Sequence, residues 1–362
     1  MKFSKQAKQV IDLITKTNDT IFVTGKAGTG KSVLLDHIKS IAKKKIIILA
    51  PTGISAINVN GETIHSFFTL KPGFELDEAK SMYMDEKKRS KYKNIQAIAI
   101  DEISMVRADL LDAIDTVLKR ARKSKDPFGG VQMIFFGDLY QLPPVLTQAD
   151  RDKFFSNYDS PYFFDANVFK SLSQKNLFSN SELSVFELDK IYRQKDRGFI
   201  DILNAVRDGA LEDKHLLSLN SRFFPSFEPE EKDNYIHLVT TNAMAATIND
   251  SRMKKLNKKE FSFTAVHSGE IARNLHPNDL EIKLCVGAQV MFICNDSDRR
   301  WVNGTIGKVI SIKSGIDPAT SKETCMIKVK KSDGVAVEVV KYTWEISKYT
   351  YKRGLFERES IG

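Results

Sequence analysis

The stretch IFVTGKAGTGKSVLLDHIKSI, residues 21–41, decides the fold of the first part of the chain. A short apolar run leads into the glycine-rich turn GKAGTGKS, residues 25–32, and an amphipathic helical pattern follows. Glycines in such a turn let backbone N–H groups surround phosphates, while Lys31 reaches the β- and γ-phosphates and Ser32 binds Mg²⁺. The stretch therefore predicts a nucleotide-phosphate site between a strand and a helix. The residues expected to contact the nucleotide are Gly25, Ala27, Gly28, Thr29, Gly30, Lys31, Ser32 and Val33.

The same alternation of strand, turn and helix runs through the first 150 residues. Strands are expected at 20–24, 45–50, 95–100 and 131–136. This alternation is typical of a parallel sheet covered by helices, so we expect an α/β fold. After the third strand, a helical pattern places five apolar residues on one face, namely Leu110, Ile114, Val117, Leu118 and Ala121.

Two carboxylates and a glutamine follow the third and fourth predicted strands. Asp101 is expected to hold Mg²⁺, and Glu102 to orient and deprotonate an attacking water. Gln141 is expected to sense the γ-phosphate or that water. The set predicts hydrolysis of a nucleoside triphosphate. Ile-Ser follows Asp101-Glu102 where a GTPase would have Asp-x-x-Gly, which argues against a GTPase or a small-molecule kinase.

The amino-acid composition narrows the kinds of protein that this chain can be. The 362 residues include 55 Lys and Arg against 46 Asp and Glu, and 42% are hydrophobic, so we expect two or three folded domains. The formal charge of +9 favours a polyanionic partner such as nucleic acid, although solvated Lys-rich faces give the same balance. Three cysteines without a C-x-x-C pair indicate neither a disulfide framework nor a zinc site. Because no apolar stretch approaches about 18 residues, we expect no membrane association and a cytoplasmic, nucleoid-associated location, or a nuclear one in a eukaryote.

The second half of the chain changes in pattern. Residues 235–240 are typical of a buried strand in a second α/β domain. Alternating segments separated by turns then predict a small antiparallel β module. A polar segment at 71–93, between the second and third strands of the first domain, has the character of an insertion. The alternating segments lie at 288–293, 305–313, 324–331 and 335–346.

The ordered motifs resemble those of the PIF (petite integration frequency) family of 5′-to-3′ DNA helicases, superfamily one class B. The resemblance covers nearly the whole chain. It rests on GKAGTGKS, APTGISAINVNGETIHSFF (50–68), IDEISM (100–105), DPFGGVQMIFFGDLYQLPPV (126–145), KIYRQKDRGFI (190–200), TTNAMAATIN (240–249) and VGAQVMFICNDSDRRWVNGTIGKV (286–309).

The resemblance implies a domain organisation. Residues 1–182 would form a first RecA-like ATP-binding domain that carries a strand-separating wedge at about 68–93. Residues 183–304 would form the N-terminal part of a second RecA-like domain. Residues 305–362 would form an SH3-like β module and a tail. The implied cofactors are ATP and Mg²⁺.

Further nucleotide residues follow from the resemblance. Tyr192 would stack on adenine and Arg193 would reach the γ-phosphate, although Tyr192 also fits a packing role. The glutamine that reads adenine in the family is either Gln6 or Gln9.

The implied partners are single-stranded DNA and forked or structured DNA, with the protein itself a monomer. Thr52, Gly53 and His65 would contact DNA in the first domain, and Thr241 and Asn242 in the second. His65, beside Ile64 and Phe67, equally fits a core histidine. The basic stretches KKRSKYK (87–93) and KRARKSK (119–125) are either DNA contacts or solvated and helix-terminal cations.

Two motifs of the family, Ile-His-Lys-Ser-Gln-Gly and Ala-Leu-Ser-Arg, are absent from the 362 residues. The first would help to grip DNA and the second would supply another arginine to the γ-phosphate. Two expectations stay open: an ATP-dependent helicase, or an ATP-regulated fragment that binds single-stranded DNA without turnover.

Overall fold

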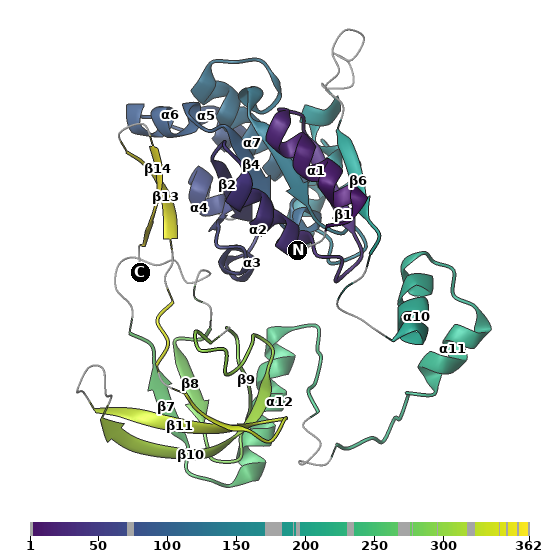
Figure 1. The fold of residues 1–362 in the computed structure, drawn as a ribbon, viewed down its shortest axis with the longest axis vertical. Coiled ribbons are helices and arrows are strands. Elements are labelled where there is room, and N and C mark those ends of the chain that lie inside the picture. Colours follow the sequence, from purple (N-terminus) through teal and green to yellow (C-terminus); the bar gives the residue numbers. More distant parts are fainter. Residues whose placement is uncertain are drawn as a thin grey trace. The chain divides into compact units, whose positions relative to one another are not determined.

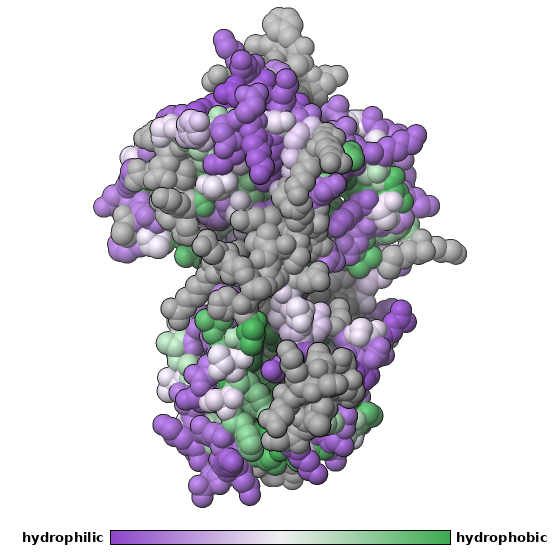
Figure 2. Space-filling model, turned by 90° about the vertical axis from the view of Figure 1, so that its left-hand side faces the viewer, coloured by the Kyte–Doolittle hydropathy of each residue, from purple (hydrophilic) through white to green (hydrophobic). Residues whose placement is uncertain are grey.

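In the computed structural model, the chain folds into two units, each formed from separate segments of the sequence (Figure 1). The first unit comprises Met1–Leu217, Ser268–Pro277 and Glu345–Gly362, and the second comprises Ser218–His267 and Asn278–Trp344. Hydrophilic side chains cover much of the face shown in Figure 2. The structure describes residues 3–70, 76–170, 183–190, 192, 196–229, 235–266, 276, 278–294, 296–316, 323–339, 341–344, 347–352 and 355–360.

A six-stranded sheet in the order β3-β2-β4-β5-β1-β6 organises the first unit, and every neighbouring pair is parallel. The four strands expected from the sequence are confirmed, and two short strands join them at the edges. The carboxyl ends of all six strands therefore lie along one edge of the sheet. The bounds are β1 Ile21–Gly25, β2 Ile46–Ala50, β3 Glu62–Thr63, β4 Ala97–Ile100, β5 Gln132–Phe136 and β6 Ser184–Leu188.

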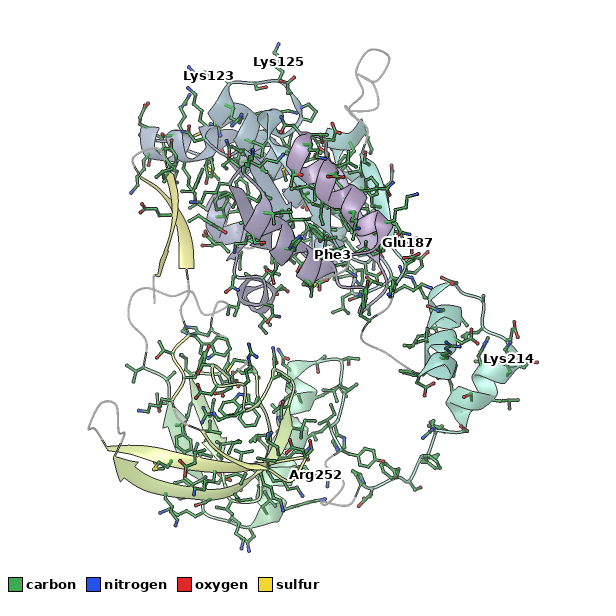
Figure 3. The ribbon with its side chains drawn as sticks, in the orientation of Figure 1. Phe3, Lys123, Lys125, Glu187, Lys214 and Arg252 are labelled. Atoms are coloured by element: carbon green, nitrogen blue, oxygen red, sulfur yellow. The ribbon has the colours of Figure 1, made fainter. Side chains whose placement is uncertain are left out.

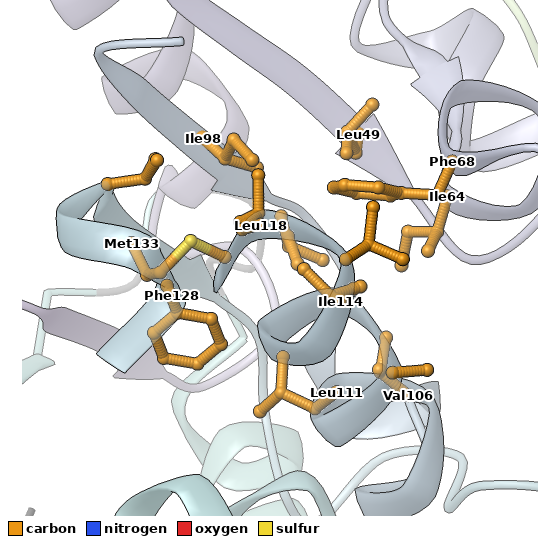
Figure 4. Close-up of a cluster of buried hydrophobic side chains, with 14 of the residues drawn as sticks. Leu49, Ile64, Phe68, Ile98, Val106, Leu111, Ile114, Leu118, Phe128 and Met133 are labelled. Carbon is orange, nitrogen blue, oxygen red and sulfur yellow. The ribbon is translucent and has the colours of Figure 1, made fainter. Parts of the chain in front are cut away.

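Both faces of the sheet are buried along its four central strands, because alternate residues of β1, β2, β4 and β5 enter two different apolar clusters. On one face, Ile98 and Met133 pack with Leu118 of α7 (Ala108–Arg122) and with Phe128 (Figure 4). On the other, Ile134 packs with residues of two helices. These are α1 (Lys5–Lys16) and α2 (Lys31–Ile41).

Helix α7 buries the apolar face expected from the sequence, with Leu110 partly buried. It also buries the charged residue Asp112. The Asp112 carboxylate accepts hydrogen bonds from the Tyr158 hydroxyl and from the backbone N–H groups of Asn167 and Val168, each at 2.9 Å. These bonds satisfy the buried charge and fasten the aromatic segment after β5 to α7.

The polar insertion forms α5 (Leu76–Ser81) and α6 (Glu86–Lys93), and residues 71–75 lie outside the described part. It packs against α7: Arg120 Nη1 donates to the Ala79 carbonyl at 2.6 Å, and Arg122 Nη1 donates to the Lys93 carbonyl at the end of α6. Lys119 pairs with Asp115 at 2.7 Å. These three cations of the stretch 119–125 therefore serve local contacts.

Lys123 and Lys125, at the end of the same stretch, are exposed and point away from the sheet (Figure 3). They remain available to a polyanion, as the sequence analysis allows for this stretch.

Shorter helices complete the first unit. Two of them follow strands at the carboxyl edge of the sheet, namely α3 (Gly53–Asn58) after β2 and α4 (Ile64–Phe68) after β3. The others are α8 (Arg151–Phe155), α10 (Arg197–Arg207) and α11 (Asp213–Asn220). No helix in the described ranges is both long and apolar enough to cross a membrane.

The second unit contains α12 (Asn242–Leu256) and antiparallel strands. The expected β module is present as a four-stranded sheet in the order β12-β11-β10-β9, around a core that includes Trp301 and Val309. The last expected strand, 335–346, is shorter, because β12 ends at Val339 and residues 341–344 form no strand. The bounds are β7 Phe261–Thr264, β8 Glu281–Leu284, β9 Gln289–Met291, β10 Ile306–Ile316, β11 Glu323–Lys331 and β12 Ala336–Val339.

The prediction of a buried strand at 235–240 is wrong. Residues 235–240 form no strand, and Tyr235, Ile236 and Leu238 are exposed, Leu238 by 90%. An apolar run becomes a buried strand only where neighbouring strands bond to it and helices cover it. In the described part of the second unit, every strand pair is antiparallel and none includes this segment.

A hairpin near residue 350 returns to the first unit. It consists of β13 (Ser347–Lys352) and β14 (Leu355–Ser360). The buried Tyr349 ring meets the Phe67 ring edge-on, with centroids 6.0 Å apart, and the Tyr349 backbone N–H donates to Glu62 Oε2 at 2.8 Å. The hairpin therefore forms part of the core around α4.

Tyr349→Ala should lower the free energy of unfolding by about 3 kcal/mol, because it removes a buried aromatic ring and leaves a cavity. Leu355→Ala, on the exposed side of the same hairpin, should cost less than about 1 kcal/mol. Urea unfolding followed by circular dichroism measures both. Equal effects of the two substitutions would contradict the packing described here.

Candidate functional site

The predicted nucleotide residues meet at the carboxyl edge of the sheet. The turn 25–32 follows β1, Asp101 follows β4, Gln141 follows β5 and Tyr192 follows β6. Since these four strands lie side by side in the order β4-β5-β1-β6, residues far apart in the sequence share one site. Ligands of open α/β sheets bind at this edge.

The glycine-rich turn needs glycine at particular positions. Gly30, the residue before α2, has φ +88°, a left-handed conformation that side chains disfavour. At Gly25, a Cβ would lie 2.6 Å from the Leu188 carbonyl oxygen, so a larger residue would push β6 away. The exposed Ser32 side chain and the half-exposed Val33 follow at the start of α2.

Lys31 lies within the turn. Its Nζ donates to the Gly25 carbonyl at 2.6 Å and to the Lys26 carbonyl at 3.3 Å. Burial lowers the pKa of Lys31, while the charges of Asp138 and Glu102 oppose that shift. An ammonium group beside a loop of backbone N–H groups suits the binding of phosphate oxygens.

The two carboxylates after β4 are held differently. Asp101 is 6% exposed, its N–H donates to the Leu49 carbonyl, and its Oδ1 accepts from the Glu102 N–H at 3.0 Å. Glu102 is half-buried and has φ +51°, an uncommon conformation for a side chain of this size. Burial, helped by the charge of Glu102, raises the pKa of Asp101 to about 6. A cation at this point would favour the ionised carboxylate.

The site fits Mg²⁺ together with phosphate oxygens. No group of three or more His, Cys, Asp or Glu in the described part of the chain could hold a metal by itself. Mg²⁺ in nucleotide sites takes one or two protein oxygens and completes its shell with phosphate and water. The Ser32 hydroxyl and the buried Asp101 carboxylate are oxygen donors of this kind.

Gln141 is held by a residue that the sequence analysis did not name. Its Nε2 donates to Asp138 Oδ2 at 3.0 Å, and Asp138 in turn pairs with Arg207 at 2.6 Å. Asp138 is 1% exposed. Asp138 could have been identified as a site residue from the sequence, because it lies just after β5. Nothing in the local sequence links Arg207 to this site.

Tyr192 lies against the glycine-rich turn. Its N–H donates to the Gly28 carbonyl at 2.8 Å, and a Cβ at position 30 would lie 3.9 Å from the Tyr192 ring. The side chain is 52% exposed, so Tyr192 does not belong to the buried core. Stacking on adenine stays a prediction. Arg193 lies outside the described residues.

The two candidates for reading adenine differ in their contacts. Gln6 Nε2 donates to Asp189 Oδ2 at 3.1 Å, directly after β6, whereas Gln9 is exposed on α1. The structure therefore brings Gln6 to the end of β6, the strand beside β1.

The predicted DNA residues of the first unit lie after the strands at the opposite end of the sheet from β6. Thr52 begins α3, where its hydroxyl accepts from the Ser55 N–H at 3.2 Å, and Gly53 follows it. His65 on α4 is half-buried and lies outside the buried clusters, and burial lowers its pKa, so it is neutral at pH 7. Its ring therefore offers hydrogen bonds without charge.

The predicted DNA residues of the second unit begin a helix. The Thr241 hydroxyl accepts from the Met244 N–H at 3.3 Å, which caps α12, and Asn242 is the first residue of that helix. Helix starts of this kind are suited to phosphate contacts.

Asp101→Asn should stabilise the protein when nucleotide and metal are removed with EDTA. Because the pKa of Asp101 is raised to about 6 from an ordinary value near 4, ionising it costs stability above pH 6 and costs nothing below pH 4. We expect a gain of about 1 to 2 kcal/mol at pH 7.5 that disappears at pH 4, measured by urea unfolding. Asp12→Asn, on the exposed side of α1, should change stability by less than about 0.5 kcal/mol at either pH. A gain for Asp101→Asn that is equal at both pH values would contradict the assigned cause.

A sequence profile of the PIF1-like helicase family matches residues 2–216. Over 335 residues the chain is 34% identical to the ATP-dependent DNA helicase PIF1 of Saccharomyces cerevisiae. That alignment covers 88% of this chain and 36% of the yeast protein, so the chain spans about a third of that relative's length.

Solved structures give the same relationship. The crystal structure of Bacteroides sp. Pif1 in complex with ADP-AlF4 matches with a TM-score of 0.85 and 33% sequence identity, over 100% of this chain and 79% of that one. The structure of Bacteroides Pif1 bound to single-stranded DNA matches over the same shares, with 33% identity and a TM-score of 0.62. On these findings, the chain belongs to the PIF1-like helicase family.

Proposed function

We propose that this chain is the ATP-driven motor of a DNA helicase that moves 5′ to 3′ along single-stranded DNA and separates duplex or structured DNA. The observation that carries the proposal is the edge of the sheet where Lys31, Asp101, Glu102 and Gln141 follow three neighbouring strands. Such an arrangement suits hydrolysis of a nucleoside triphosphate. Membership of the helicase family supports DNA as the partner.

In the proposed reaction, the backbone of residues 25–32 and Lys31 bind the phosphates of ATP. Ser32 and Asp101 hold Mg²⁺, which neutralises phosphate charge when it is bound. Glu102 orients the attacking water and accepts its proton. Gln141 contacts the γ-phosphate or that water. The relative bound to ADP-AlF4 supports ATP as the nucleotide.

Residues after β6, together with Gln6 of α1, serve the base and the γ-phosphate in this proposal. Tyr192 stacks on adenine, and Gln6 hydrogen-bonds to it. Arg193 supplies a cation to the γ-phosphate. The half-exposed Tyr192 ring beside the glycine-rich turn supports this placement.

Single-stranded DNA contacts Thr52, Gly53 and His65, with Thr241 and Asn242 as further contacts. We further propose two RecA-like domains, an SH3-like module and a wedge formed by α5 and α6. The relative bound to single-stranded DNA supports that ligand. Binding that includes phosphate contacts weakens as the salt concentration rises.

A second candidate function is binding of ATP and single-stranded DNA without turnover. The observation that favours it is the exposed segment 235–240, which carries apolar side chains and pairs with no strand in the described part of the second unit. A domain in which this apolar segment joins no sheet is less able to organise a complete nucleotide site.

Glu102→Gln should reduce ATP hydrolysis in the presence of single-stranded DNA by about 100-fold or more, because the group that takes the proton is lost. ATP binding should stay within about threefold of the wild type, since the phosphates and Mg²⁺ keep their ligands. A phosphate-release assay at low salt with Mg²⁺ measures the rate. Hydrolysis that DNA stimulates and the variant loses supports the motor, whereas intact binding without hydrolysis in the wild type supports the second candidate.

Lys31→Ala should abolish binding of a fluorescent ADP analogue, because the cation that faces the phosphates is removed. Binding of labelled single-stranded DNA without nucleotide should be retained, which shows that the variant is folded. Lys39→Ala, farther along α2, is the matched control and should bind the analogue as the wild type does. Unchanged nucleotide binding by Lys31→Ala would contradict the assignment of the glycine-rich turn.

A further inference from the structure

An ion pair joins the end of α10 to the site. Arg207, the last residue of α10, donates from Nη1 to both carboxylate oxygens of Asp138, at 2.6 and 2.7 Å. The Arg207 side chain is 13% exposed and that of Asp138 is 1% exposed. The guanidinium also lies over the Tyr140 ring, 4.2 Å from its centroid. Breaking a pair this buried would leave an uncompensated charge beside the nucleotide residues.

The same carboxylate fixes Gln141. Asp138 Oδ2 accepts from Gln141 Nε2 at 3.0 Å, Asp138 Oδ1 accepts from the Tyr140 N–H at 3.2 Å, and the Gln141 N–H donates to the Asp138 carbonyl at 3.0 Å. Burial alone would raise the pKa of Asp138, but the hydrogen bonds from Gln141 and Arg207 lower it below its ordinary value. Asp138 is therefore ionised at neutral pH, and it accepts from Gln141 and Arg207 at once.

Helix α10 depends on polar contacts for its position. Ala205 is the one buried residue among its eleven, while Phe199 and Leu203 are 43% and 49% exposed. Its neighbour α11 contributes the buried His215, whose Nε2 lies 3.3 Å from Asp201 Oδ2 on α10 and whose Nδ1 accepts from the Glu212 N–H at 3.1 Å. The two helices are thus joined to each other, and Arg207 joins them to the loop after β5.

We propose that Arg207 is a positioning residue for γ-phosphate recognition: by pairing with Asp138, it holds the Gln141 amide in the orientation that meets the γ-phosphate. The inference rests on the proposed function, because it assumes that Gln141 contacts that phosphate. It assigns Arg207 no contact with the nucleotide. Loss of the pair frees the Asp138 carboxylate to turn, and the Gln141 side chain loses its fixed partner.

The test compares two nucleotides that differ in the γ-phosphate. Affinities of the wild type and of Arg207→Ala for ADP and for the non-hydrolysable ATP analogue AMP-PNP are measured with Mg²⁺ by calorimetry. We expect Arg207→Ala to weaken AMP-PNP binding fivefold or more and to leave ADP binding within twofold. A merely structural role would weaken both nucleotides alike or neither.

Three further variants and a control identify the route of the effect. Gln141→Ala should show the same selective loss. The double variant Gln141→Ala/Arg207→Ala should bind AMP-PNP no less tightly than whichever single variant binds it less tightly, because both changes disable the same contact. Arg207→Lys should restore part of the selectivity, since an ammonium can still pair with Asp138. Arg197→Ala, at the exposed start of α10, is the matched control and should bind both nucleotides as the wild type does.

If Arg207→Ala does not fold, Asp138→Asn/Arg207→Gln removes both buried charges together and takes its place, with the same selective loss expected. The proposal is overturned if the variant keeps the wild-type ratio of the two affinities, or if the losses of the two single variants multiply in the double variant. A wild type that binds neither nucleotide would refute the proposed function itself, which keeps the two failures distinct.

Discussion

Parallel pairing of six strands is the constraint on which the first unit depends. Helices cover both faces of the sheet, so the central strands β1, β2, β4 and β5 are largely apolar, and charged groups concentrate where the strands end. Because all strands run the same way, those ends share one edge. Lys31, Asp101 and Asp138 therefore lie in one neighbourhood although more than a hundred positions separate the first from the last.

At that edge, neighbouring protein groups rather than solvent determine how well each buried carboxylate is stabilised. Asp101 and Asp138 are both buried, yet the pKa of Asp101 is raised and that of Asp138 is lowered. The difference lies in the donors, since Asp138 accepts from a guanidinium and an amide, whereas Asp101 accepts from one backbone N–H and faces Glu102. The carboxylate that lacks a cation of its own is the one proposed to hold Mg²⁺.

The features that could be predicted from the sequence are local ones. A run such as 46–50 or the turn 25–32 carries its own pattern, and the structure confirms both. The Asp138–Arg207 pair joins positions 69 residues apart, and no periodicity encodes it. Residues 235–240 have the apolar pattern of a buried strand but lack the neighbouring elements that would bury them. The prediction of a strand there, which rests on the pattern alone, is therefore wrong. The roles assigned to Arg193 and to the DNA residues stay predictions.

The hairpin that holds Tyr349 delays completion of the core of the first unit during biosynthesis. The sheet is complete once β6 has left the ribosome, but its core around Phe67 waits for Tyr349 and Phe356, about 170 residues after Leu188. At about 5–20 residues per second, that wait lasts roughly 10 to 30 seconds. During it the nascent chain exposes an apolar surface that its own last strands will later cover. The burial of this part of the core is therefore tied to the order in which the strands are synthesised.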